Sequence, residues 1–228
     1  MMKIFLTLYL LLLSITTLGD IKKQDLLRLE KGEQVLSTKK VNANPWPRIR
    51  IYQLVDASPL ETLAIFLALD HQKNYLPNVK ESDPVKHVSP TEVYTSYELE
   101  LPWPLSNSHY THASDFKKVS ENEYTAKWWM ITSESAESVE GSARFSSYKG
   151  KTIMEYNSLV KPKSFLAGLV KDTMLEDTQA SIEAVRTELA RLKKEDTKLL
   201  EKYKKIITES LNGLNVYGEV IKSHSSKK

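Results

Sequence analysis

The stretch from Tyr148 to Leu192, YKGKTIMEYNSLVKPKSFLAGLVKDTMLEDTQASIEAVRTELARL, changes its hydrophobic period at Pro162. Before this proline, apolar and polar residues alternate, which is typical of a strand with one buried face. After it, the period becomes helical, with apolar or small residues at Leu166, Val170, Met174, Thr178, Ile182, Val185, Leu189 and Leu192. This spacing predicts one amphipathic helix of about seven turns, with Ser164 as its N-cap.

The strand pattern begins well upstream of this helix, at about Val85, and runs to Val160. The segments SENE, ESAESVEG and KGK separate the strands at hairpin spacing, so we expect an antiparallel sheet with one wet side. The faces predicted to be buried carry Val93, Thr95, Tyr97, Leu99 and Leu101 in one strand, Tyr124, Ala126, Trp128 and Met130 in another, and Met154, Tyr156, Ser158 and Val160 in the last.

A first strand and two short helices are predicted before this sheet. The run RIRIYQLVDA, residues 48–57, alternates as a half-buried strand does. Ser58, Pro59 and Glu61 then supply an N-cap hydroxyl, a proline in the first helical turn and a carboxylate that can close a capping box. A second short helix is expected before Pro77.

These elements predict an α+β fold. The apolar stripe of the long final helix needs a partner, and the only large apolar surface left is the concave side of the sheet. We therefore expect a curved antiparallel sheet wrapped around the long helix, with two short helices after the first strand and an extra helical tail at the C-terminus.

The segment LELPWPLSN, residues 99–107, places Trp103 between two prolines. Proline ends regular strand pairing, so the indole is expected at the end of the sheet, at the mouth of any cavity under the final helix. On this hypothesis Trp103→Ala weakens binding of a hydrophobic probe about ten-fold and costs less stability than emptying a core site does. The alternative is that the ring only plugs the edge of the sheet.

The two ends of the chain differ from its middle. Residues 1–19 combine Lys3, a 12-residue apolar run and the cleavage-site residues Thr17-Leu18-Gly19, which predicts a cleaved signal peptide and a secreted or periplasmic protein. The alternative is an uncleaved membrane anchor, for which the apolar run is shorter than the about 20 residues that a spanning helix needs. Residues 20–44 are expected to be an N-terminal extension, 45–192 the ligand-binding domain and 193–228 a charged helical tail. The chain has no cysteine, so disulfides cannot stabilise it.

Composition excludes several function classes. The net charge of +3 comes from 32 basic and 29 acidic residues that are interspersed, so no nucleic-acid partner is expected. His109 and His112 project to opposite faces of a strand and cannot hold one metal ion, and no metal or cofactor is expected. There is no nucleophile elbow and no phosphate loop, so catalysis finds little support.

The order of elements, together with VDASPLETLAIFLALDHQKNYLPNV, PWPLSN and YKGKTIMEYNSLVKP, resembles the START-like helix-grip superfamily. This superfamily includes lipid-transfer domains, polyketide cyclases and coenzyme Q-binding proteins. The resemblance implies a hydrophobic cavity between the sheet and the final helix, occupied by a lipid or another hydrophobic small molecule. The candidate ligand contacts are Tyr97, Leu99, Trp103, Tyr110, Trp128, Met130, Met154, Tyr156, Leu166, Val170 and Met174.

Three functions stay open at this point. The first is an exported, non-catalytic module that binds a hydrophobic molecule, and the second is a polyketide cyclase-like enzyme on the same fold. The third is an interaction protein whose cavity is filled and whose tail helix contacts a membrane or a protein. Tyr97, Tyr110 and Tyr156 could aim hydroxyls into a cavity or bond to nearby carbonyl groups instead.

Overall fold

The computed structural model describes residues 21–225, and the side chains of all of these except 165, 166 and 223–225. The predicted signal peptide therefore lies outside the described residues. No helix within the described part of the chain is both long enough and apolar enough to cross a membrane.

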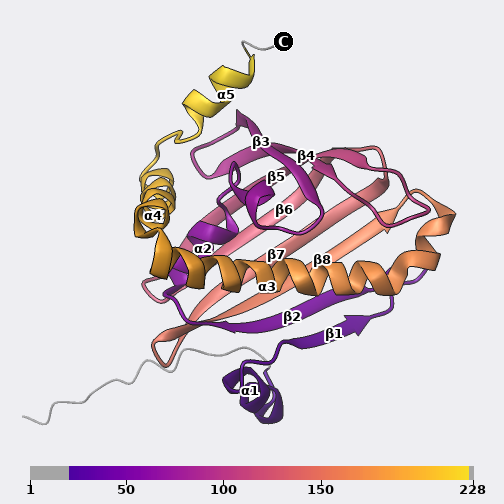
Figure 1. Ribbon diagram of the computed structural model, residues 1–228, viewed down its shortest axis with the longest axis horizontal. Coiled ribbons are helices and arrows are strands. Elements are labelled where there is room, and N and C mark those ends of the chain that lie inside the picture. The colour runs from indigo at the N-terminus through magenta and orange to yellow at the C-terminus, as the bar shows by residue number, and fades with distance from the viewer. Residues whose placement is uncertain (1–20, 226–228) are drawn as a thin grey trace, which may run out of the picture.

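The core of the fold is one eight-stranded antiparallel sheet with the order β1-β2-β8-β7-β6-β5-β4-β3 (Figure 1). Its first and last long strands are neighbours, because β2 pairs with β8 in a register that sets Ile51 opposite Tyr156. The strands are β1 (Val35–Lys39), β2 (Arg48–Val55), β3 (Val79–His87), β4 (Glu92–Leu99), β5 (Ser108–Ser120), β6 (Glu123–Ser133), β7 (Ala136–Tyr148) and β8 (Lys151–Pro162).

A long helix, α3 (Lys171–Glu195), lies across the strands on one side of the sheet, as Figure 1 shows. It buries Ile182, Val185, Leu189 and Leu192, in agreement with the predicted stripe. The helical segment begins directly after Ser164, but its first six residues form the 3-10 segment η2 (Phe165–Val170), so the α-helix itself begins later than predicted. Gly168 within η2 disfavours an α-helix there, and α3 begins without a side-chain cap.

The helix α2 (Pro59–Phe66) begins as predicted. The Ser58 side chain accepts a hydrogen bond from the backbone N–H of Glu61, and the Glu61 carboxylate accepts one from the backbone N–H of Ser58. Leu63, Ala64 and Ile65 are fully buried, because α2 packs between the sheet and α4. The second short helix is the 3-10 segment η1 (Gln72–Asn74), and α2 with η1 covers the end of the sheet that α3 leaves open.

The sheet begins before Pro45, where the ligand-binding domain was expected to start. The helix α1 (Lys23–Glu30) is followed by β1, which pairs with β2 so that Val35 lies opposite Tyr52. Leu29 and Val35 pack with Tyr52 and Ile153 in a small second core on the far face of the sheet. The predicted extension therefore contributes an edge strand, which its charged composition concealed.

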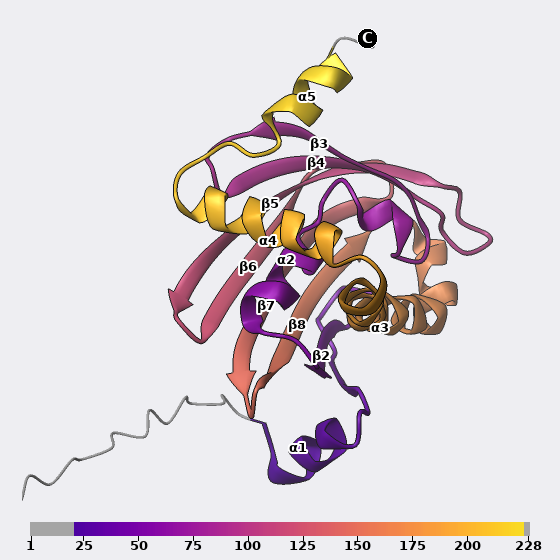
Figure 2. The same ribbon diagram turned by 60° about the vertical axis from the view of Figure 1, so that its left-hand side comes forward.

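The tail is helical, as predicted, and it packs on the domain. It forms α4 (Thr197–Leu211), which lies against α2 (Figure 2), and α5 (Gly218–Ser225), which lies against β3. Leu200, Tyr203 and Ile207 are at most 4% exposed and belong to the main core. Tyr217, between the two helices, donates its hydroxyl to the backbone carbonyl of Leu67 at 2.9 Å. The core thus extends past Leu192.

Candidate functional site

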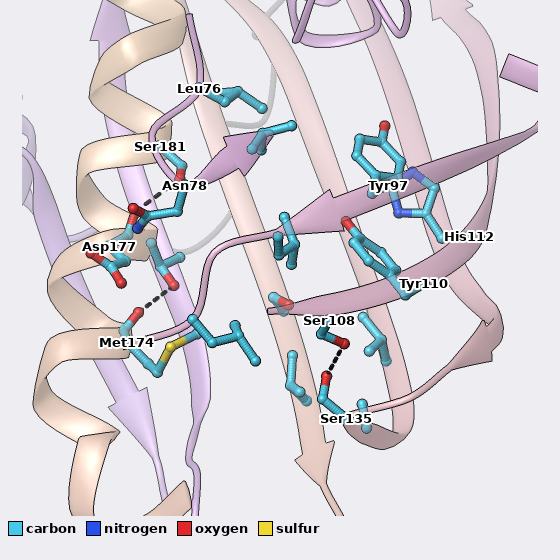
Figure 3. A pocket seen from close by; sticks show the side chains of 18 of the residues that line it. Leu76, Asn78, Tyr97, Ser108, Tyr110, His112, Ser135, Met174, Asp177 and Ser181 are labelled. Carbon is cyan, nitrogen blue, oxygen red and sulfur yellow. Dashed lines mark hydrogen bonds between the residues drawn. The ribbon is translucent and has the colours of Figure 1, made fainter. Parts of the chain in front are cut away.

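A cavity of about 660 Å³ lies between the concave face of the sheet and α3. Strands β4 to β8 form its floor. The helix α3 forms the opposite wall (Figure 3). Two loops, 75–79 and 100–107, close its sides. The indole of Trp46 also borders it, and its Nε1–H donates to the Ala167 carbonyl oxygen at 2.7 Å, which fixes η2 to the start of β2.

Three rings from neighbouring strands form one side of the cavity. Tyr97 on β4 and Tyr110 on β5 are opposite each other in register, and their ring centroids are 5.0 Å apart. The His112 ring lies 4.7 Å from that of Tyr97 and 5.6 Å from that of Tyr110. The Tyr97 hydroxyl donates to the Gln72 side-chain oxygen at 2.5 Å, so it is already bound within the protein.

The deep end of the cavity is closed by Trp128. Its indole stacks on Tyr156 with 5.1 Å between ring centroids, and Phe66 from α2 packs on it at 5.8 Å. The ring lies flat over Gly141, its partner in the β6–β7 register. Because glycine has no Cβ, the indole can approach the neighbouring strand this closely.

Polar groups occupy two places on the cavity wall, as Figure 3 shows. On the sheet side the Ser108 hydroxyl donates to the Ser135 hydroxyl at 2.6 Å. On the helix side Asp177, Thr178 and Ser181 line the cavity. The lining is therefore mostly apolar and aromatic with a few placed polar groups, which is the usual composition of a small-molecule site.

Comparison with known proteins gives matches in structure alone, since no protein-family model and no curated protein sequence matches the chain. A STAR-related lipid transfer protein from Xanthomonas axonopodis superposes with a TM-score of 0.63 at 16% identity, over 69% of this chain and 93% of that one. Human STARD10 superposes with a TM-score of 0.59 at 14% identity, over 85% and 89%. The chain has a START-like helix-grip fold.

A third structure with the START-like fold is the Zhui aromatase/cyclase from Streptomyces sp. R1128. It superposes with a TM-score of 0.52 at 8% identity, over 65% of this chain and 96% of that one. The predicted family resemblance in fold and the α+β helix-grip architecture are both confirmed.

Six of the predicted contact residues line the cavity of this START-like fold. They are Tyr97, Leu99, Tyr110, Trp128, Tyr156 and Met174. Their contact with a ligand remains a prediction, and Leu166 lies outside the residues whose side chains are described.

Trp103 does not line the cavity, contrary to prediction. Its side chain is 89% exposed, whereas the flanking Leu101 and Leu105 border the cavity. The backbone N–H of Leu105 donates to the Pro102 carbonyl oxygen at 2.9 Å, which closes a tight turn. The turn directs the two leucines inward and leaves the indole at its tip, so Trp103 is neither a plug nor a rim residue.

Met154, Met130 and Val170 are also not part of the lining. Met154 is fully buried opposite Phe145 in the β7–β8 ladder, where α2 covers the sheet, so it belongs to the core. Met130 pairs with His112 next to a register shift in the β5–β6 ladder. At this point of the cavity wall the lining side chain is that of His112 and not that of Met130. Val170 is buried at the end of η2, outside the cavity, because the 3-10 geometry displaces it from the predicted helical stripe.

Sequence reasoning missed His112 and Asp177 as lining residues. From the sequence, His112 enters only as a candidate metal ligand. Its alternation with Tyr110 and Ser114 in β5 nevertheless places all three side chains on the inner face of the sheet. Asp177 directly precedes Thr178 of the predicted helical stripe, and a carboxylate beside an apolar stripe is ordinarily a solvated group.

The tyrosine and histidine side chains on the sheet side of the cavity carry no charge at neutral pH. Burial raises the pKa of the Tyr97, Tyr110 and Tyr156 hydroxyls, so these groups keep their protons. Burial also lowers the pKa of His112 from 6.5 to about 4, and its polar neighbour is the Ser114 hydroxyl at 3.2 Å. At neutral pH the imidazole is therefore uncharged.

This histidine makes stability depend on pH. Because its pKa is lower in the folded state, the unfolded chain binds more protons between pH 6.5 and about 4, and stability falls as the pH decreases through this range. The loss is at most about 3 kcal/mol, and less where water in the cavity solvates the ring. Urea unfolding of the wild type and His112→Gln at several pH values measures it. Equal pH dependence of the two proteins would contradict this assignment.

The exposed position of Trp103 leads to a second prediction. Trp103→Ala is expected to change both the free energy of unfolding and the affinity for a hydrophobic probe little, by about 0.5 kcal/mol or less. Trp128→Ala is the matched comparison, and it is expected to cost about 3 to 5 kcal/mol because its indole is only 9% exposed. Urea unfolding and probe titration on the same preparations check both. A ten-fold loss of affinity in Trp103→Ala would restore the rim assignment.

Proposed function

We propose that this protein is a non-catalytic module that holds one hydrophobic small molecule, a lipid, between its sheet and α3. The observation that carries the proposal is the cavity of about 660 Å³ lined by Tyr97, Tyr110, Trp128, Tyr156 and Met174. A START-like protein of similar fold is named a lipid transfer protein, which agrees with this choice of ligand class.

The two alternatives from the sequence have less support. A filled core conflicts with the open cavity. A cyclase-like enzyme has the support of the Zhui aromatase/cyclase fold, and His112 could serve as a base in the cavity. However, the polar partner of His112 within the described residues is the Ser114 hydroxyl, with no carboxylate to orient the ring for proton transfer.

A tail contact to a membrane or to another protein would have to use an outer surface. The apolar face of α4 is occupied by the domain, where Leu200, Tyr203 and Ile207 are buried. The outer face is rich in lysine and glutamate, for example Lys202, Lys205 and Glu209. We therefore place the binding function in the cavity and not in the tail.

Probe binding tests the cavity directly. The uncharged dye N-phenyl-1-naphthylamine is expected to bind at one site and gain fluorescence, because the cavity excludes water from it. Thr178→Trp places a large ring in the cavity and is expected to weaken dye binding at least about ten-fold. Glu176→Trp is the matched control, because Glu176 is exposed on the same helix and does not line the cavity. Equal dye binding by both variants would reject the cavity as the site.

Export is a further part of the proposal, and it is supported by the predicted signal peptide in residues 1–19. Expression in a bacterial host should yield a periplasmic or secreted protein that begins near Asp20. Mass analysis of the soluble protein checks this, and Met1 retained on the mature soluble chain would contradict it.

A further inference from the structure

We infer that the cavity selects amphiphiles whose polar head is uncharged or cationic and carries a hydrogen-bond donor, and that it rejects anionic heads such as carboxylate and phosphate. This inference rests on the proposed function, because it concerns the ligand of the same cavity. It is carried by the part of the α3 wall formed by Asp177, Thr178 and Ser181, which we call the acceptor wall.

The acceptor wall can accept hydrogen bonds from a ligand, but its hydroxyl hydrogens are already used in bonds within α3. The Thr178 hydroxyl donates to the Met174 carbonyl oxygen at 2.7 Å, and the Ser181 hydroxyl donates to the Asp177 carbonyl oxygen at 2.9 Å (Figure 3). A hydroxyl has one hydrogen, so both oxygens can only accept a further bond from a ligand. The oxygens of the Asp177 carboxylate are also hydrogen-bond acceptors. The acceptor wall therefore favours a ligand whose polar head donates hydrogen bonds.

The charges around the cavity favour the same class. Three carboxylates border it, and two of these have partners: Glu100 is paired with Lys80 at 2.6 Å, and Glu134 accepts from the backbone N–H of His109 at 2.9 Å. For the Asp177 carboxylate, residues 21–222 supply no ion-pair partner. The acceptor wall therefore carries an uncompensated negative charge.

Among the described residues that line the interior of the cavity, no cationic side chain balances the charge of Asp177. Within the described lining, Lys163 is the only lysine or arginine. It is exposed at the rim, where its ammonium group donates to the Ser133 carbonyl oxygen at 2.6 Å. His112, the histidine of the lining, is neutral at pH 7.

The sheet side could hydrogen-bond an anion but could not neutralise it. Ser108 donates to Ser135, which leaves the Ser135 hydroxyl hydrogen free for a ligand, and the Tyr110 hydroxyl is also on this wall. A buried carboxylate held by neutral hydroxyls alone would lose its hydration and would face Asp177 across the cavity, which is unfavourable. An alcohol loses much less hydration, and an ammonium group gains a charge-assisted hydrogen bond from Asp177.

The cavity also has room for an alkyl chain. Its volume of about 660 Å³ is within the range usual for small-molecule sites, about 300 to 1,000 Å³, so probes with one hexadecyl chain are suitable test ligands.

Three probes that share one hexadecyl chain test the inference: hexadecan-1-ol, hexadecylamine and hexadecanoate. Each competes with N-phenyl-1-naphthylamine on the full-length protein at neutral pH, below its aggregation concentration. The alcohol and the amine are expected to displace the dye, and hexadecanoate is expected to bind at least about ten-fold more weakly than the alcohol.

Asp177→Asn separates charge from size. It removes the negative charge and adds a hydrogen-bond donor. It is therefore expected to raise the affinity for hexadecanoate and lower the affinity for hexadecylamine, each about five-fold or more, and to change the affinity for the alcohol little. Asp172→Asn is the matched control, because Asp172 is exposed on the same helix and paired with Lys171, and no probe should respond to it.

The outcomes separate the two proposals. Hexadecanoate that binds the wild type as tightly as the alcohol, or affinities unchanged by Asp177→Asn, would overturn the inference and leave the binding function standing. If the dye and all three probes fail to bind, the proposed function itself is wrong.

Discussion

Truncation after Asp196 is expected to leave a chain that is largely unfolded at room temperature. The deletion removes Leu200, Tyr203, Ile207 and Tyr217, which are at most 4% exposed and pack in the main core. Burial of each large apolar side chain contributes about 1.5 to 3 kcal/mol. The sum of these contributions is comparable to the free energy of unfolding of a whole domain, which is about 5 to 15 kcal/mol. The predicted domain boundary at residue 192 would instead leave such a chain folded.

Circular dichroism and urea unfolding of the truncated chain measure the effect. Since a truncated chain can aggregate, the point variant Ile207→Ala provides a second measurement, with an expected cost of about 2 to 5 kcal/mol. Leu214→Ala is the matched control, because Leu214 is 54% exposed in the same tail and should cost about 0.5 kcal/mol or less. A truncated chain that unfolds cooperatively at nearly the wild-type urea concentration would show that the tail is an appendage.

Gly141→Ala is expected to be the most damaging single-methyl change in the cavity wall. A Cβ at this position would lie 2.1 Å from two carbons of the Trp128 indole, closer than nonbonded atoms come. Because Phe66 and Tyr156 pack against the indole, relief requires the ring to move into the cavity. We expect a loss of about 1 to 3 kcal/mol or more in stability, together with weaker dye binding.

Urea unfolding, tryptophan fluorescence and dye titration of this variant test the prediction. Gly168→Ala is the matched control, because a Cβ there meets its nearest atom, in Pro45, at 3.9 Å, an ordinary contact. In the Gly141→Ala background, Trp128→Phe should lower the free energy of unfolding less than it does in the wild type, since the smaller phenyl ring relieves the clash with the added Cβ. Equal stability of the two glycine variants would mean that the indole has room to adjust.

The sheet and the long helix could be predicted because their periods differ. Alternation over strands such as β4 and the step of three to four residues along α3 are local properties of the chain, and burial in the structure follows both. The inner positions of Tyr97, Trp128 and Tyr156 follow from this alternation alone.

Features decided by distant contacts could not be predicted in the same way. The polar edge strand β1 forms only because β2 offers it hydrogen bonds, and α4 is fixed by its fit to α2. The direction of Trp103 depends on a turn between Pro102 and Leu105, not on strand alternation. Asp177 has the spacing of an ordinary surface carboxylate, and only the shape of the cavity gives it a ligand-facing position.

The pairing of β2 with β8 also bears on how the chain folds. It joins residues such as Arg50 and Asn157, which are 107 positions apart and hydrogen-bonded at 2.9 Å. Contacts of such long range are formed slowly, because the intervening chain must be ordered first. A ribosome must therefore release the chain as far as β8, which ends at Pro162, before the sheet can close, and a nascent chain held short of β8 stays accessible to chaperones. Stopped-flow refolding should accordingly be slower than that of a helical bundle of similar length.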